Sequence, residues 1–341
     1  MTFCAAPFVH MVQNPDGQYR TCCMFEKPLN GDYKNIHEAF NSDENRKIRQ
    51  KMLSGKNLEE CSKCDIDEMH SGKTGISYRK TFNDSYGREY VDNPIFKTLE
   101  FSTSNKCNFK CIDCGPRFSN QFGPTNENDI PNFDSLQHLE FLKILGGEPF
   151  LDKKNIELLE MSPRKNIKLM LVTNNSIFPS QSTLKLLSEF KFLNINLSID
   201  GIKDVAEFVR YGTKWKRFER NWNKWQEWGH DKKNCHIVPH FVMHSLNAPF
   251  FEETLSWSKI KFSWWSWDFL VTPKWLNMSY LPGQIKNHII DNNVNLKEPL
   301  KKFLNSNEYD SKAFKKLLLK SENAPNQMNN YIDLLYSNYE R

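Results

Sequence analysis

The sequence lacks both a long apolar run and an export signal. It has no stretch of about 18 consecutive apolar residues, so no membrane-spanning helix is expected. Residues 1–7 have neither the basic start nor the long apolar segment of a signal peptide. We therefore expect a cytoplasmic protein with no membrane partner.

The chain also lacks a block of charge of one sign. Its formal net charge is +5, and lysines are interspersed with acidic residues along the sequence. This balance does not indicate a nucleic-acid partner. With 341 residues, of which 39% are hydrophobic and 26% charged, the chain has a globular composition. Its length allows one large domain of about 200 to 250 residues and a smaller one.

Cysteine is plentiful, since the chain has nine, and most of them fall in tight clusters. Disulfides are uncommon in the cytoplasm, so clustered thiols there indicate metal or cluster ligation. The densest group is Cys107, Cys111 and Cys114. Three thiolates this close together can hold three corners of a cubane iron–sulfur cluster and leave the fourth iron open. A closed structural site would need a fourth ligand nearby, and none is obvious in this segment.

The order of apolar segments predicts an α/β fold. Short apolar strands alternate with helical stretches, such as residues 180–190 and 250–258, as in consecutive βα units around a parallel sheet. Six strands are expected, at residues 96–103, 141–145, 168–173, 194–199, 236–244 and 262–271. Six βα units make a partial (β/α)6 barrel over residues 94–271. We expect a small cysteine-rich module before it, at residues 1–90, and a helical extension after it, at residues 272–341.

Polar motifs follow four successive strands of this predicted barrel. They are the segment from Cys107 to Cys114, then Gly146-Gly147-Glu148-Pro149, then Thr173-Asn174, and then Ser198-Ile199-Asp200. In βα folds, catalytic groups gather at the carboxyl edge of the sheet. Each motif alone is most often a turn or a helix cap. Their joint order favours a single functional site.

The Cys-x3-Cys-x2-Cys spacing, followed by Gly-Gly-Glu-Pro, resembles the radical S-adenosylmethionine (SAM) enzymes. The resemblance implies a [4Fe–4S] cluster on Cys107, Cys111 and Cys114 whose open iron chelates the amino and carboxylate groups of SAM. Asp113 stands where many members have an aromatic residue beside the adenine, a position that Phe109 or Ile112 can partly fill.

The same resemblance implies a set of SAM contacts. Gly146, Gly147, Glu148 and Pro149 form the motif that receives the SAM amino group. Thr173, Asn174 and Ser198 offer short polar side chains for the ribose hydroxyls and the methionyl carboxylate, beside Asp200 at the end of the fourth strand. Arg210 is expected to bind that carboxylate, and Val242 to contact the adenine. The alternative for Arg210 is that its stem covers a helix face.

Cys4, Cys22, Cys61 and Cys64 form a second group, whose spacing resembles the twitch module, a shortened SPASM-like auxiliary iron–sulfur domain. This module usually follows the barrel, whereas here it precedes it. Four thiolates complete a second [4Fe–4S] cluster with no open iron. Cys23 is the alternative to Cys22 as a ligand. Zinc is the alternative metal, because four thiolates bind it equally well.

The resemblance implies that an electron donor of the reductase, flavodoxin or ferredoxin type reduces the cluster. SAM is then cleaved to a 5′-deoxyadenosyl radical that removes hydrogen from a substrate. That substrate is either a peptide or protein, or a small molecule such as a nucleotide. The competing class is a non-catalytic iron–sulfur or zinc protein that binds a partner.

Overall fold

The computed structural model describes residues 3–25, 27–71, 77–261, 266–293 and 297–339. Within these residues the main sheet has eight strands in the order β10-β9-β7-β6-β5-β3-β1-β2. All neighbouring strands are parallel except β1 and β2. The strands are β1 (His10–Gln13), β2 (Tyr19–Arg20), β3 (Thr98–Phe101), β5 (Phe141–Ile144), β6 (Lys168–Thr173), β7 (Phe192–Ser198), β9 (Cys235–Met243) and β10 (Ser266–Phe269). The predicted α/β fold with a mostly parallel sheet is confirmed.

Alternation along β7 shows why this segment forms a strand. Leu193, Ile195 and Leu197 are almost fully buried on one face. Asn194 and Asn196 point to the other face and are only half-buried. A period of two residues places every second side chain on the same face of a strand. The apolar face of β7 is part of the hydrophobic core, whereas its polar face, with Asn194 and Asn196, is not.

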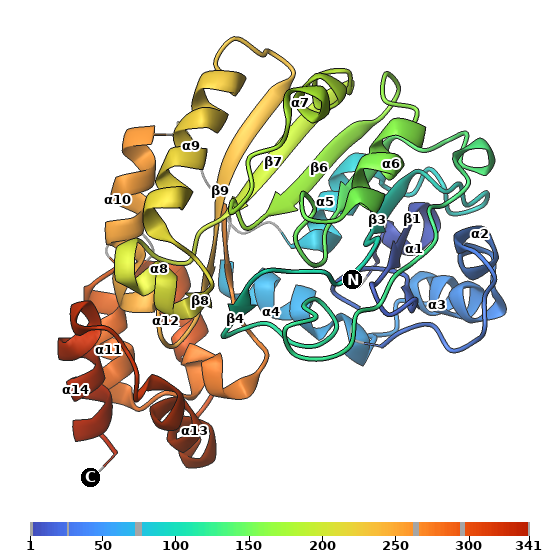
Figure 1. The fold of residues 1–341 in the computed structure, drawn as a ribbon. Coiled ribbons are helices and arrows are strands. Elements are labelled where there is room, and N and C mark those ends of the chain that lie inside the picture. Colours follow the sequence, from blue (N-terminus) through green and yellow to red (C-terminus); the bar gives the residue numbers. More distant parts are fainter. Residues whose placement is uncertain (1–2, 26, 72–76, 262–265, 294–296, 340–341) are drawn as a thin grey trace.

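Helices connect the successive parallel strands, as βα units require. They are α6 (Lys153–Met161), α7 (Gln181–Ser188), α8 (Lys203–Val209), α9 (Trp215–Gly229) and α10 (Phe251–Lys261). Figure 1 shows α9 alongside β9, with which it is in contact. On α9, Trp222 and Trp225 lie one turn apart and are fully buried. This helix therefore buries large aromatic surface on the side that faces the protein core.

The N-terminal region contributes two strands to the main sheet. The six strands predicted between residues 94 and 271 are present as β3, β5, β6, β7, β9 and β10, but two further strands of the main sheet were not predicted: β1 pairs in parallel with β3, and β2 extends the edge beyond it. The same region contains α1 (Ala6–Val9), α2 (Ile36–Phe40), α3 (Asp43–Leu53), α4 (Ser62–Ser71) and α5 (Tyr78–Tyr86). One continuous hydrophobic core joins residues from Phe3 to Trp225. The domain boundaries given above stay a prediction.

A second core lies under the C-terminal helices. It joins buried residues of α8 and β9 to α11 (Gly283–Asp291), α12 (Lys297–Leu304), α13 (Ser311–Ser321) and α14 (Asn329–Ser337). Helices therefore occupy the C-terminal region, as the sequence predicts. Of the predicted strand at residues 262–271, Ser266–Phe269 forms β10, and residues 262–265 lie outside the described part. None of the helices in the described ranges is long and apolar enough to cross a membrane.

Candidate active site

The four polar motifs meet at the carboxyl edge of the main sheet. β3 ends at Phe101, β5 at Ile144, β6 at Thr173 and β7 at Ser198. These strands are adjacent and parallel, so the segments that follow them emerge side by side. The structure therefore brings the Cys107–Cys114 segment together with the Gly-Gly-Glu-Pro turn, Asn174 and Asp200.

The two glycines let the Gly-Gly-Glu-Pro turn pack on the cysteine loop. Gly146 and Gly147 have φ angles of +86° and +51°, which side chains disfavour. A Cβ atom on Gly147 would lie 2.1 Å from the Lys106 carbonyl oxygen. That oxygen accepts a hydrogen bond from the Glu148 backbone N–H at 2.7 Å, and the Gly147 N–H donates to the Phe118 oxygen at 2.9 Å. Glycine is therefore needed for the approach of one loop to the other.

Glu148 joins β5 to the end of β6. The Thr173 hydroxyl donates to its Oε1 at 2.7 Å, and the Asn174 backbone N–H donates to its Oε2 at 2.8 Å. Burial raises the pKa of Glu148 to about 7, although these hydrogen bonds oppose the shift. Glu148 and Thr173 thus support the site by holding two loops together. The Pro149 carbonyl accepts from Asn155 at 3.1 Å and fixes the exit of the turn.

Asn174 reaches the cysteine loop directly. Its Nδ2 atom donates to Asn108 Oδ1 at 3.0 Å and lies 3.9 Å from Cys107 Sγ. Ser176 also contacts Asn108, because the Asn108 Nδ2 atom donates to its hydroxyl at 3.0 Å. The contacts link the end of β6 to the first of the three cysteines. Sequence reasoning missed Asn108 and Ser176, although an amide next to Cys107 was a usable signal.

A small second sheet ties Cys111 to Arg210. β4 (Lys110–Cys111) pairs antiparallel with β8 (Arg210–Tyr211), with Cys111 opposite Arg210. Burial raises the pKa of the Cys111 thiol, and the Arg210 guanidinium opposes this shift. A cation beside a thiol favours the thiolate form that binds iron. Cys111 therefore sits in a short strand beside a positive charge.

Arg210 and Asp200 form a buried ion pair. Arg210 Nη1 lies 2.5 Å from Asp200 Oδ2, while Asp200 Oδ1 accepts from the Val242 backbone N–H at 2.8 Å. Asp200 is nearly fully buried and connects β7 and β9. Within the described residues Arg210 Nε has no hydrogen-bond partner. Val242 and Ser198 both lie at the same edge of the sheet.

Asp113 adds a second carboxylate near this ion pair. Burial raises its pKa to about 6, the Asp200 charge adds to this effect, and Arg210 opposes it. The carboxylates of Asp113 and Asp200 thus both interact with the positive charge of Arg210. Sequence reasoning noted Asp113 only as a departure from an aromatic residue, and its closeness to Arg210 depends on the β4–β8 pairing.

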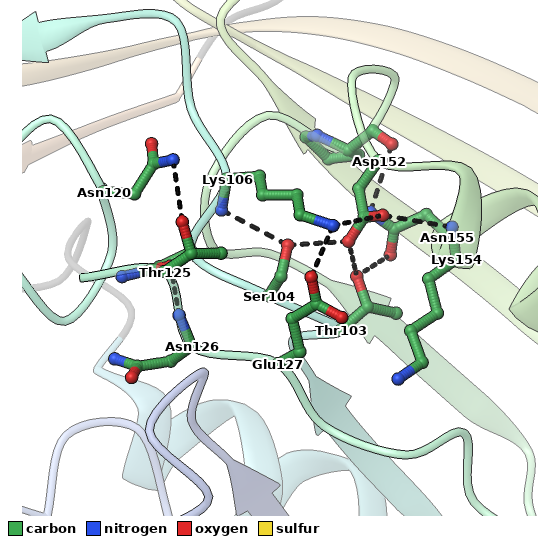
Figure 2. Close-up of polar contacts among 12 residues, drawn as sticks. Thr103, Ser104, Lys106, Asn120, Thr125, Asn126, Glu127, Asp152, Lys154 and Asn155 are labelled. Carbon is green, nitrogen blue, oxygen red and sulfur yellow. Dashed lines mark hydrogen bonds and ion pairs between the residues drawn. The ribbon is translucent and has the colours of Figure 1, made fainter.

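Asp152 anchors the segment that leads into the cysteine loop (Figure 2). Its Oδ2 atom accepts from the Ser104 hydroxyl at 2.6 Å and from the Thr103 hydroxyl at 3.1 Å. Its Oδ1 atom caps α6 by accepting from the Lys154 N–H at 3.1 Å. Lys106 extends the network, with an ion pair of 2.5 Å to Glu127. One buried carboxylate therefore holds both α6 and the residues just before Cys107.

The three cysteines of the loop suit an iron–sulfur cluster chemically. Cys107, Cys111 and Cys114 are all free thiols. The Cys114 thiolate interacts electrostatically with both of the others, which places the three in one neighbourhood. Within the described ranges no His, Cys, Asp or Glu side chains form a ready-made metal-binding group. The assignment of these ligands stays a prediction.

The structure also gathers the cysteines of the N-terminal region. The charge of Cys4 interacts with those of Cys61 and Cys64, and the charge of Cys22 interacts with those of Cys4 and Cys64. Three segments distant in sequence thus converge. Cys23 contacts the thiol of Cys22 and also lies near Glu100 and Lys143 at the sheet. The choice of Cys22 over Cys23 as the fourth thiol of this group stays a prediction.

Comparison with known proteins points to the same family as the four polar motifs at the carboxyl edge of the sheet. Residues 101–257 match the model of the Radical SAM superfamily. The match begins at the end of β3 and includes all four motifs of the edge. Residues 101–257, a little under half of the chain, thus match a radical SAM domain, and this match supports the predicted class of enzyme.

Two relatives share part of the chain. The GTP 3′,8-cyclase of Mannheimia succiniciproducens is 25% identical over 190 residues, which cover 52% of each protein. The probable GTP 3′,8-cyclase of Methanocaldococcus jannaschii is 28% identical over 147 residues, covering 40% of this chain and 45% of that protein. The chain spans about half the length of these relatives.

Solved structures of two proteins show a loose likeness. Native anSMEcpe with bound AdoMet is 20% identical with a TM-score of 0.45, and the match covers 66% of this chain and 65% of that one. Streptococcus suis SuiB bound to precursor peptide SuiA is 17% identical with a TM-score of 0.43, covering 87% and 60%. At these TM-scores no conclusion rests on the likeness.

Proposed function

We propose that the chain cleaves SAM reductively at a [4Fe–4S] cluster held by Cys107, Cys111 and Cys114. The observation that carries this proposal is the meeting of the cysteine loop and the Gly-Gly-Glu-Pro turn at one edge, where Gly147 touches Lys106. When bound, the reduced cluster and SAM supply a 5′-deoxyadenosyl radical that removes hydrogen from a substrate.

The residues around the edge have distinct roles in this proposal. The Gly146–Gly147 turn brings backbone carbonyls close to the SAM amino group. Thr173 and Glu148 hold that turn against β6, and Asn174 links it to the loop. Ser198 and Val242 line the neighbouring strand ends. Arg210 offers an Nε–H group that the described residues leave without a partner. A SAM carboxylate suits such a donor.

The test is a SAM cleavage assay on anaerobically reconstituted protein. We expect 5′-deoxyadenosine only when a reductant such as dithionite is added. The Cys111→Ala variant should form none, because the cluster loses a ligand. Cys235→Ala is the matched control, since this free thiol lies on β9 away from the loop, and it should keep full activity. A loaded cluster that yields no 5′-deoxyadenosine would favour the non-catalytic alternative.

Cys4, Cys22, Cys61 and Cys64 are proposed to hold the auxiliary cluster. The mutual interaction of their thiolate charges supports this proposal. Cys61→Ala should lower the iron content but leave the SAM-binding cluster in place. Equal iron loss from both sites would contradict two independent clusters. Zinc in the purified protein in place of this iron would identify the alternative metal.

A nucleotide is the small-molecule substrate class that the relatives favour, because both are named as GTP cyclases. GTP is therefore the first probe. We expect GTP to increase the rate of 5′-deoxyadenosine formation over the rate with SAM alone. GTP should be consumed at the same rate as 5′-deoxyadenosine is formed. An unchanged rate with GTP and other nucleoside triphosphates would direct the search to peptides. The electron donor is expected to be a flavodoxin, ferredoxin or reductase.

A further inference from the structure

A cavity of about 330 Å³ lies between α5 and strands β1, β3, β5 and β6. Its exposed residues Glu140 and Lys168 lie at the amino ends of β5 and β6. The cavity is therefore entered from the edge of the sheet opposite the candidate active site. Glu100 and Lys143 stand side by side in register at its inner end. Lys143 is three residues before Gly146, or about 10 Å along the strand.

The inner end of the cavity holds a buried group of polar side chains. Lys143 Nζ lies 3.1 Å from Glu100 Oε2 and donates to the Tyr78 hydroxyl at 2.5 Å. His10 Nε2 lies 3.7 Å from Glu100 Oε1. The side chains of Glu100 and His10 are 2% and 1% exposed. Burying charges at this depth costs several kcal/mol, which makes the group a candidate binding site.

The charge states of these groups follow from their contacts. Burial opposes charge on both members of the pair, but the Glu100 carboxylate raises the pKa of Lys143, and the Lys143 ammonium lowers the pKa of Glu100. Both are therefore ionised. Burial lowers the pKa of His10 to about 4, so the imidazole is neutral at pH 7. The group carries one charge of each sign.

The group also has unused hydrogen-bonding capacity of both kinds. Lys143 has three N–H donors, of which Tyr78 accepts one among the described residues, whereas the 3.1 Å contact with Glu100 Oε2 is an ion pair without hydrogen-bond geometry. The Tyr78 oxygen accepts from Lys143, and its own O–H has no acceptor among the residues that the structure describes. In the described part of the chain, Glu100 Oε2 and His10 Nε2 accept no hydrogen bond. Two donors and two acceptors thus lie next to one another at the inner end of the cavity.

The apolar part of the remaining wall is formed by Phe82, Tyr86, Phe141 and Met170. The rest of this wall is polar, namely Thr81, Ser85 and Thr98, with Glu140 and Lys168 at the amino ends of the strands. A pocket of this size with partly apolar walls and a few converging polar groups is typical of small-ligand sites. A carboxylate matches the Lys143 and Tyr78 donors, and an ammonium matches the Glu100 and His10 acceptors. An α-amino acid carries both groups on one carbon atom, next to its side chain.

We propose that this cavity binds a small zwitterion of amino-acid size with an apolar side chain. The carboxylate accepts from Lys143 and Tyr78, the ammonium donates to Glu100 and His10, and the side chain packs on Phe82 and Phe141. The site is separate from the carboxyl edge, so it does not depend on the proposed SAM chemistry. We assign it binding and no chemical step.

Isothermal titration calorimetry with the full chain tests the proposal. The probes are L-leucine, L-methionine, L-phenylalanine, L-tyrosine and L-tryptophan. We expect at least one to bind with a Kd of about 1 mM or less. Its amide, its decarboxylated amine and its deaminated acid should each bind at least about tenfold more weakly, because each lacks one charged group. Equal binding of the amino acid, its amide, its amine and its deaminated acid would overturn the proposal. So would the absence of saturation by any probe at about 10 mM.

Variants localise the binding. Lys143→Met and Glu100→Gln should each abolish it, whereas Lys274→Met should leave it unchanged. Lys274 is a matched control because it also pairs with a carboxylate, Asp310, but in the C-terminal region. Should the two buried variants fail to fold, Phe82→Trp fills the cavity without removing a charge and should also abolish binding. Unchanged affinity in Phe82→Trp would place the ligand elsewhere.

Discussion

Single residues set how closely the loops of the candidate active site approach one another. Gly147 has no room for a side chain, because Lys106 O, C and N would all lie within 2.9 Å of its Cβ atom. Glu148 and Asp152 are nearly fully buried, and each accepts several hydrogen bonds from neighbouring segments. The support of the site therefore depends on one glycine with no space for a side chain and on two buried carboxylates.

Gly147→Ala should lower the free energy of unfolding by at least about 2 kcal/mol. Its φ of +51° disfavours a side chain, and the Lys106 backbone cannot move away without displacing the cysteine loop. Urea unfolding measures the effect. Gly283→Ala is the control, because a Cβ there meets nothing within 4 Å, and it should change stability by less than about 0.5 kcal/mol. Equal stability of both variants would contradict the close contact.

His244→Asn should change how stability depends on pH. Burial lowers the pKa of His244 to about 4 from an unfolded value of 6.5, and its Nδ1 accepts from the Leu246 N–H at 3.2 Å. Between these pH values the unfolded chain binds more protons, so the wild type loses stability as pH falls. Relative to His244→Asn, this loss should approach about 1.4 kcal/mol per pH unit. Parallel pH curves of the two proteins would show that His244 titrates normally.

At the scale of elements, short strands and helix caps position the site. Cys111 is held by the β4–β8 pair, and α6 starts at the carboxylate that also binds Thr103 and Ser104. The cysteine segment is therefore held in place, because Thr103 and Ser104 before it hydrogen-bond to Asp152 at the start of α6, and Cys111 within it pairs with β8.

Asp152→Ala should destabilise the fold by about 2 to 4 kcal/mol, because it removes a helix cap and two buried hydrogen bonds. Ser180→Ala is the comparison. Among the described residues the Ser180 hydroxyl caps α7 through the Thr183 N–H and otherwise bonds only the Ser182 and Thr183 hydroxyls of the same turn, so its loss should cost about 1 kcal/mol. Denaturant unfolding followed by circular dichroism measures both. Similar losses in the two variants would mean that Asp152 acts only as a cap.

Long regular elements could be predicted from the sequence. The strand at 168–173 has the bounds of β6, and the helix expected at 180–190 appears as α7 after its Ser180 cap. β1 could not be found in this way. Its four residues are buried or nearly so on both faces, so they show no alternation. Its pairing with β3 joins residues about 88 positions apart, which no local pattern encodes.

In the candidate site, too, some residues could be predicted from local sequence and others depend on tertiary contacts. Cys107, Gly147 and Asn174 follow strands in sequence, so their common edge was predictable. Arg210 was expected to face SAM, but its pairing with Asp200 depends on tertiary contacts of β8. Glu100 and Lys143 were missed as a pair. A charge in a strand usually indicates a solvent-facing position, but here the covering helix α5 helps to bury Glu100 and most of Lys143.

At the scale of the whole molecule, the two cysteine groups predict the metal content. Reconstituted protein should bind about eight iron atoms, four in each cluster. Replacing Cys107, Cys111 and Cys114 together by alanine should leave about four, and so should replacing Cys4, Cys22, Cys61 and Cys64 together. Iron analysis with Mössbauer spectroscopy measures this. Loss of all iron from either variant would show that the clusters depend on one another.

The position of β1 has a consequence for shortened forms of the chain. β1 lies between β2 and β3, so it covers the hydrogen-bonding edge of β3. Deleting residues 3–20 would uncover the N–H and C=O groups of Thr98–Phe101, which are then free to pair with a strand of another molecule. Such a truncated protein should self-associate, so its oligomers would say nothing about the native assembly.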